Sequence, residues 1–428
     1  MAFQFVRKPV FTPKAQSLKE LEIYIGIDFG TTFSKVSLQI GDAEGTRKYS
    51  IRFNDQGDEG DYCLPSVLGY DENDKLLVYT DDPEDCGLTP VRYFKYSMIE
   101  KGVPREVDDL RGGQTQNDPQ RLCSAFYLAH LLRAARRHIL EHPAVKGRWS
   151  QIRWYVNMGV PVSDFNAKPK PIYDEALNVA WNLSQDESLK AEMAIPQLDE
   201  YYSRWIDHST WSARLNTVPE LYAEIIMFLQ ARTTGTGFYS VIDIGGGTVD
   251  MAVFLKRIDE GNEHRIDIYC VSQDVCPLGY ELYKNVLDED IAEKMMYRSY
   301  ANCLDPAYHQ HRNVMQRTFD NEQSLVHFYM GGARKVEFYH GCVDKVDYNY
   351  VRGMSAYRGA EECDMLEFMG RSVNLEIRGN HRLLISQMLA QPFEKMPELS
   401  GQPWHFKASP LRTAPSLEDL QDHLNGPL

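Results

Sequence analysis

Residues 24–37 read YIGIDFGTTFSKVS, and residues 241–253 read VIDIGGGTVDMAV. In each stretch an apolar run typical of a β-strand leads to an aspartate, Asp28 or Asp243, then to Gly and Thr residues and a second apolar run. Glycine lets backbone N–H groups approach a phosphate closely, and threonine hydroxyls add donors. An aspartate at a strand end can hold a hydrated Mg²⁺. One such hairpin is weak evidence, but two with the same order of residues predict a pair of phosphate-binding turns that face each other across a cleft.

The bulk composition favours a globular protein with two lobes or domains. The chain has 428 residues, and a chain of this length usually forms more than one hydrophobic core. Its composition, 43% hydrophobic and 25% charged residues, is that of a globular protein. A formal net charge of -15 argues against nonspecific binding to nucleic acid, which needs a basic surface. The eight cysteines have neither a zinc nor a redox spacing. We expect no membrane span and no secretory signal, and therefore a cytoplasmic protein.

Segments typical of strands and helices alternate along the chain, which predicts an α/β fold. The two Gly-rich hairpins, each followed by helices, suggest a duplicated core. We expect an N-terminal arm at 1–20, a Pro-rich tail at 400–428 and no assignable pattern at 343–380. Strands are expected at 22–29, 33–40, 152–160, 239–255 (a hairpin), 265–271 and 325–330, and helices at 118–141, 171–183, 187–193, 219–232, 281–300 and 382–389.

The two hairpins resemble the phosphate motifs of a known superfamily. Residues 26–34, GIDFGTTFS, are similar to the first phosphate motif of the actin, sugar-kinase and heat-shock ATPase superfamily, and residues 243–250, DIGGGTVD, are similar to its second. Residues 328–336, FYMGGARKV, resemble its adenosine motif. The forms of these motifs most resemble the nucleotide-binding domain of the 70-kDa heat-shock chaperones.

The resemblance covers about residues 23 to 389, and it implies an actin-like ATPase fold. In that fold two lobes, here 21–218 and 219–399, each contain a duplicated ribonuclease-H-like core, and ATP lies in the cleft between them. It also implies Mg²⁺ as the cofactor, held through water by Asp28, Asp243 and Asp250.

The resemblance assigns further roles to single residues. Lys95, in YFKY at 93–96, stands where the family has its catalytic lysine, and Glu220, in VPELYAE at 218–224, stands where it has a water-positioning glutamate. Asp243 is the third catalytic candidate. A lysine between aromatic residues is also typical of a surface position, and a glutamate in a first helical turn can simply favour the helix dipole. The candidates for phosphate and adenosine binding are Gly30, Thr31, Thr32, Phe33, Gly245, Gly246, Gly247, Thr248, Gly331, Gly332, Ala333, Arg334 and Lys335.

These features together predict an ATP-binding and ATP-hydrolysing switch, similar to the heat-shock proteins, that acts on a separately encoded partner protein. No segment after residue 389 resembles a peptide-binding β-sandwich and lid, so peptide chaperoning of the usual kind is not implied. The order Pro219-Glu220 is more similar to plasmid-segregating actin relatives, and it supports a filament-forming ATPase as the alternative. A small-molecule kinase is less favoured, because no motif for a catalytic base lies between the two hairpins.

Overall fold

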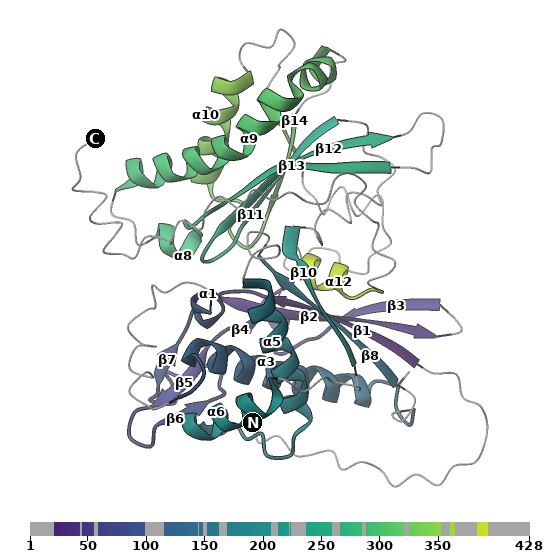
Figure 1. The fold of residues 1–428 in the computed structure, drawn as a ribbon, viewed down its shortest axis with the longest axis vertical. Helices are drawn as coiled ribbons and strands as arrows, with labels where there is room; N and C mark the ends of the chain where they lie inside the picture. Colours follow the sequence, from purple (N-terminus) through teal and green to yellow (C-terminus); the bar gives the residue numbers. More distant parts are fainter. Residues whose placement is uncertain are drawn as a thin grey trace.

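The structure is a computed structural model that describes residues 21–42, 45–54, 59–98, 115–143, 145–148, 152–161, 169–206, 213–221, 223, 237–258, 266–284, 288–320, 325–351, 360–363 and 383–392. Figure 1 shows a large sheet with its helices in each half of the molecule. The sheets contain both parallel and antiparallel pairs, so the predicted α/β class is confirmed. The predicted arm at 1–20 and tail at 400–428 lie outside the described residues.

The first sheet forms around the first predicted hairpin. Strand β1 pairs antiparallel with β2, and β2 pairs antiparallel with β3. On the other side of β1, β8 and then β10 run parallel to it, so the carboxyl ends of β1, β8 and β10 lie at one edge. The order of the strands is β10 (Ala213–Pro219), β8 (Ile152–Val160), β1 (Leu21–Phe29), β2 (Phe33–Asp42) and β3 (Gly45–Ser50), with β4 (Leu64–Pro65) paired to β2.

The second sheet repeats this topology. Strands β11, β12 and β13 form an antiparallel meander, and β14 and β15 run parallel to β11 on its other side. Asp28 near the end of β1 and Asp243 near the end of β11 therefore occupy corresponding positions. The order of the strands is β13 (Ile266–Cys276), β12 (Val249–Ile258), β11 (Gly237–Ile244), β14 (Leu325–Met330) and β15 (Ala360–Cys363).

Each large sheet has its own hydrophobic core. The buried residues of the first core lie between 21 and 202, and those of the second lie between 238 and 346. The first sheet is accompanied by α3 (Pro119–Glu141), α5 (Pro169–Gln185) and α6 (Ile195–Trp205), and the second by α9 (Glu289–Asp320) and α10 (Glu337–Val351). The shorter elements are η1 (Glu59–Tyr62), α1 (Phe94–Ser97), α8 (Tyr280–Tyr283), α12 (Leu384–Leu389) and a small sheet of β7 (Thr89–Val91), β5 (Leu68–Asp71), β6 (Leu76–Val78) and β9 (Glu192–Ala194). None of the described helices is long and apolar enough to cross a membrane.

Several element boundaries differ from the sequence expectations. The predicted helix at 187–193 is wrong: Asp186 accepts a hydrogen bond from the backbone of Ser188, and this Asx turn is followed by β9. The helix begins instead at Ile195, with a proline in its first turn. The predicted helix at 281–300 is divided into α8 and α9. Helix α3 begins as expected, because Asp118 caps it by accepting from the backbone N–H of Gln120.

Helix α12 returns to the first sheet from the end of the described chain. Residues 383–392 belong by sequence to the predicted lobe at 219–399, but α12 packs on β1, β2 and β8. A Cβ on Gly26 would overlap the backbone of Ser386 and Ala390, so only glycine permits this approach. Asn157 of β8 donates from its amide to the carbonyl oxygen of Leu389 (2.7 Å). The glycine at position 26 of the first motif therefore has a packing cause.

Candidate functional site

The turns of the two predicted hairpins lie against each other. One turn joins β1 to β2 and contains Thr31 and Thr32, and the other joins β11 to β12 and contains Gly246 and Gly247. A Cβ on Gly246 would overlap the Thr32 side chain, and a Cβ on Gly247 would lie 3.4 Å from Cγ2 of Thr31. The structure therefore brings together the two stretches that the sequence predicts to face each other.

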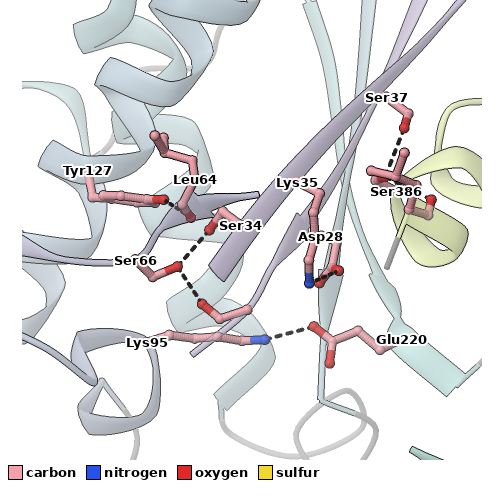
Figure 2. A network of polar contacts seen from close by, with 12 residues as sticks. Asp28, Ser34, Lys35, Ser37, Leu64, Ser66, Lys95, Tyr127, Glu220 and Ser386 are labelled. Atoms are coloured by element: carbon pink, nitrogen blue, oxygen red, sulfur yellow. Dashed lines mark hydrogen bonds and ion pairs between the residues drawn. The ribbon is translucent and has the colours of Figure 1, made fainter. Parts of the chain in front are cut away.

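Ser66, which follows β4, supports the first turn from behind. Its backbone N–H donates to the carbonyl oxygen of Thr32 (2.8 Å), and its hydroxyl donates to that of Gly30 (2.8 Å; Figure 2). The described peptide bonds are all trans, and the N–H of a trans peptide points opposite to its C=O. Because these two carbonyl groups point toward Ser66, the N–H groups of Thr31 and Phe33 point away from it.

The second turn is supported in the same manner by residues 279–281, which lead into α8. The backbone N–H groups of Gly279, Tyr280 and Glu281 donate to the carbonyl oxygens of residues 247, 245 and 246, at 3.1, 2.9 and 2.9 Å. A Cβ on Gly279 would lie only 2.5 Å from the backbone of Thr248. The N–H groups of residues 246–248 therefore point away from α8. Successive backbone N–H groups of this kind make concavities that bind anions.

Two ion pairs lie beside the turns (Figure 2). Asp28, near the end of β1, pairs with its cross-strand neighbour Lys35 at 2.8 Å. Lys95 of α1 pairs with Glu220, the residue after β10, at 2.7 Å. Burial alone lowers the pKa of Lys35, but the attraction and hydrogen bond of Asp28 outweigh it and raise that pKa. Lys95 is buried and its ammonium lies 5.7 Å from the ring centre of Phe29, so Lys95 is not a surface lysine.

Two further carboxylates complete this charged cluster. Asp243 and Asp250 are cross-strand neighbours on β11 and β12. Loss of hydration, followed by the charges of Glu220 and Asp28, raises the pKa of Asp243 to about 7. Loss of hydration, followed by Glu220 and Asp243, raises the pKa of Asp250 to about 8. Burial also raises the pKa of Glu220 against the attraction of Lys95. When all groups are ionised, four carboxylates against two ammonium groups leave an excess of negative charge, which favours a divalent cation.

Three buried polar atoms of this site have no hydrogen-bond partner among the described residues: Oγ1 of Thr32, Oδ1 of Asp243 and Oδ1 of Asp250. A buried polar atom without a partner is costly, so native structures usually satisfy it with protein, water or a ligand. No group of three or more His, Cys, Asp or Glu side chains in the described part of the chain could ligate a metal ion. The two unpartnered carboxylate oxygens fit a hydrated ion that contacts Asp243 and Asp250 through its waters.

The third predicted motif lies next to Asp243. Gly331 has a φ of +80° at the end of β14, and a Cβ there would overlap the carbonyl oxygen of Ile244 and Oδ1 of Asp243. The N–H of Ala333 donates to the same carbonyl oxygen (3.3 Å). Gly332 has open space around it. Arg334 is half-buried and Lys335 is exposed.

The remaining predicted residues lie in the turns, and the sequence analysis missed some residues of the site. Gly245 closes the second turn by donating to the carbonyl oxygen of Thr248 (2.9 Å). Phe33, at the end of the first turn, is 37% exposed and is the one exposed large hydrophobic side chain among the described residues.

Sequence reasoning missed Lys35 and Ser66. The signal for Lys35 is its position opposite Asp28 in a tight hairpin, whereas Ser66 has no signal apart from its place after a short strand.

Neither the comparison with models of known protein families nor the comparison with curated proteins finds a match to this chain.

Proposed function

We propose that this protein binds Mg-ATP between its two halves and hydrolyses it, within an actin-like fold similar to the nucleotide-binding domain of the 70-kDa heat-shock chaperones. One observation carries the proposal: two turns with outward N–H groups, from two sheets of equal topology, meet at a charged cluster with an excess of carboxylates. A triphosphate needs many hydrogen-bond donors and a divalent cation, and this arrangement suits both. The repeated topology supports two lobes with duplicated cores.

The two turns would hold the phosphate groups. The N–H groups of Thr31 and Phe33 on one side, and those of residues 246–248 on the other, point away from their supports and are oriented before a ligand arrives. The hydroxyl of Thr32, which has no hydrogen-bond partner in the described part of the chain, adds a donor. The ammonium groups of Lys35 and Lys95 can bind phosphate oxygens, because each lies at the edge of the same cluster.

Mg²⁺, when bound, would neutralise the charge of the phosphates. Asp243 and Asp250 are the residues that would hold its waters, because each has a buried oxygen atom to which no described residue donates a hydrogen bond. Asp28 is already paired with Lys35. It would bind a water of the Mg²⁺ ion only if the ammonium group of Lys35 left it to bind a phosphate oxygen.

Hydrolysis would use the pair formed by Lys95 and Glu220. A phosphate oxygen beside Lys95 gives its ammonium a second anion to bind, and Glu220 then becomes free to align an attacking water or accept its proton. The raised pKa of Glu220 makes it a stronger base than an exposed glutamate. Lys95 would stabilise charge on the transferred phosphoryl group, which is the main contribution of protein to this chemistry. The switch would act on a partner protein that is encoded separately.

The test is ATP binding and phosphate release by the purified protein with and without Mg²⁺, compared with Asp243→Asn. The matched control is Asp74→Asn, an exposed aspartate in the turn between β5 and β6. We expect Mg²⁺-dependent hydrolysis in the wild type and in the control, and a loss of at least about 100-fold in Asp243→Asn. Sedimentation with ATP distinguishes a filament from a monomeric switch. A wild-type protein that neither binds nor cleaves ATP contradicts the proposal.

A further inference from the structure

One histidine of α10 supports the turn at 331–336, which belongs to the stretch that resembles an adenosine motif. Nε2 of His340 lies 2.6 Å from the carbonyl oxygen of Arg334. A carbonyl oxygen only accepts hydrogen bonds, so Nε2 carries the proton. The imidazole also stacks on the ring of Tyr329, with the ring centres 3.8 Å apart and an angle of 19° between the planes.

These two contacts fix the turn at both of its ends. Tyr329 lies in β14, just before the turn begins, and Arg334 lies beyond the two glycines. Between them the N–H of Ala333 is bonded to Ile244, and Gly331 packs on Asp243. The open space at Gly332 is therefore bordered by backbone that cannot easily move. His340 itself belongs to α10 and is not part of this turn.

The carbonyl group that His340 holds belongs to the peptide between Arg334 and Lys335. The orientation of that peptide sets the direction of the Lys335 N–H, because the two groups of a trans peptide point in opposite directions. It also limits the directions in which the side chains of Arg334 and Lys335 leave the turn. These two cations are among the residues predicted to bind the adenosine.

We propose that His340 is a positioning residue that preorganises this turn, so that the site prefers a nucleoside triphosphate over a triphosphate without a base. The inference rests on the proposed function and deepens it. A turn that is already ordered loses little conformational entropy when a base binds, and the gain is seen as affinity. The turns at 30–33 and 245–248 have their own supports in Ser66 and in residues 279–281, so phosphate binding does not need His340.

If His340 only packed α10 on the sheet, its replacement would have different effects from those expected of a positioning residue. Loss of such a residue lowers the stability of the whole second half, and it weakens binding of every ligand there by the same factor. The hydrogen bond and the ring stack can also be separated. His340→Gln keeps a donor and loses the stack, and His340→Phe keeps a ring and loses the donor.

The experiment measures the affinity of the full chain for Mg-ATP and for Mg-tripolyphosphate by calorimetry, and the steady-state kinetics of ATP hydrolysis. We expect His340→Ala to weaken ATP binding about tenfold, which is the effect of about one hydrogen bond, and tripolyphosphate binding less than twofold. The KM for ATP rises with kcat nearly unchanged, and His340→Gln recovers most of the loss. Lys345→Ala, at an exposed position of the same helix, is the control and leaves both affinities unchanged.

Equal losses for the two ligands, or no loss for either, would overturn the inference. If His340→Ala fails to fold, His340→Phe, which loses the donor, should show the same selective loss of ATP binding, and His340→Gln, which keeps a donor, should not. A wild-type protein that binds ATP no better than tripolyphosphate contradicts the inference but leaves phosphate binding intact. A wild-type protein that binds neither ligand contradicts the proposed function itself.

Discussion

Lys95 and Glu220 are both buried, with Nζ of Lys95 2.7 Å from Oε1 of Glu220, so each is the other's counter-ion in the interior. Removal of one partner from a buried ion pair leaves a charge that has lost its solvation and its counter-ion. We predict that Lys95→Met lowers the free energy of unfolding by about 3 kcal/mol. We also predict that Glu220→Gln, added to Lys95→Met, restores at least half of that loss. Urea denaturation of the two single variants and the double variant measures this coupling. Additive losses in the double variant would contradict it.

The raised pKa values of Asp243 and Asp250 predict a free energy of unfolding that falls as pH rises. Their pKa values are raised from 3.8 to about 7 and about 8, so between these limits the folded protein binds more protons than the unfolded chain. This contribution is complete below about pH 4 and is lost as pH rises through the folded pKa values. Each such proton contributes a slope of about -1.4 kcal/mol per pH unit.

The variant Asp250→Asn isolates one of these protons. We expect its free energy of unfolding, measured in urea between pH 5 and 8 without Mg²⁺, to vary less with pH than that of the wild type. The exposed change Asp74→Asn serves as the control and leaves the slope unaltered. A slope in Asp250→Asn equal to that of the wild type would contradict the buried, proton-binding state of this carboxyl group.

Most site residues could be predicted from the sequence, because the residue type and its neighbours carry the chemistry. Asp28 and Asp243 each end an apolar run and precede glycines, and this pattern is visible in a single sequence. Ser66 could not be predicted, since its role comes from the backbone carbonyl groups that it meets after folding. The burial of Lys95, which decides between a surface lysine and a site residue, also depends on the packing of α1 beside Phe29.

Helix α12 is the element that links the end of the described chain to the site. Its Leu389 and the side chain of Glu220 both lie over Gly159 of β8, at 3.4 and 2.9 Å from where a Cβ would stand. Ser386 of the same helix hydrogen-bonds to Ser37 at 2.8 Å (Figure 2). Displacement of α12 would therefore open the space beside Glu220 as well as the face of the sheet.

Two glycines give a matched test of this packing. Gly26→Ala places a methyl group against the backbone of α12, and we expect it to lower the free energy of unfolding by about 2 kcal/mol. Gly341→Ala, in α10 with open space around it, should instead raise it by about 0.5–1 kcal/mol, because alanine is the better helix former. Chemical denaturation measures both changes, and hydrogen exchange of residues 383–392 should quicken in Gly26→Ala alone. Unchanged exchange there would show that α12 does not depend on this contact.

Elements with a long, regular pattern could be predicted, whereas those that depend on a distant partner could not. Helix α3 has apolar residues at helical spacing and a capping aspartate, and its start agrees with the expectation. Strand β9 has only three residues, and it forms because it pairs with β6. This pairing cannot be seen in the sequence, so a helix was predicted there instead. The place of α12 on the first sheet depends on Gly26, which lies far away in the chain.

At the scale of the whole molecule, two sheets of the same topology have separate cores. The sequence indicates this repeat only through its two hairpins, because the parallel strands that complete each sheet have no common motif. The buried residues of one core all precede residue 203, and those of the other all follow residue 237. The two halves contact each other at the turns around Thr32 and Gly246, where a bound nucleotide would contact both of them.

This arrangement predicts that ligand binding couples the unfolding of the two halves. Without nucleotide each core can unfold independently, so we expect two transitions in scanning calorimetry. Mg-ATP at about 100 times its Kd adds about 2.7 kcal/mol to the state in which both halves are folded, because it binds only when both turns are in place. The lower transition should therefore move up and merge with the other, and Asp243→Asn should keep them apart. A single transition without nucleotide would mean that the two halves do not unfold independently, and a nucleotide that leaves the lower transition in place would mean that the ligand does not bridge the halves.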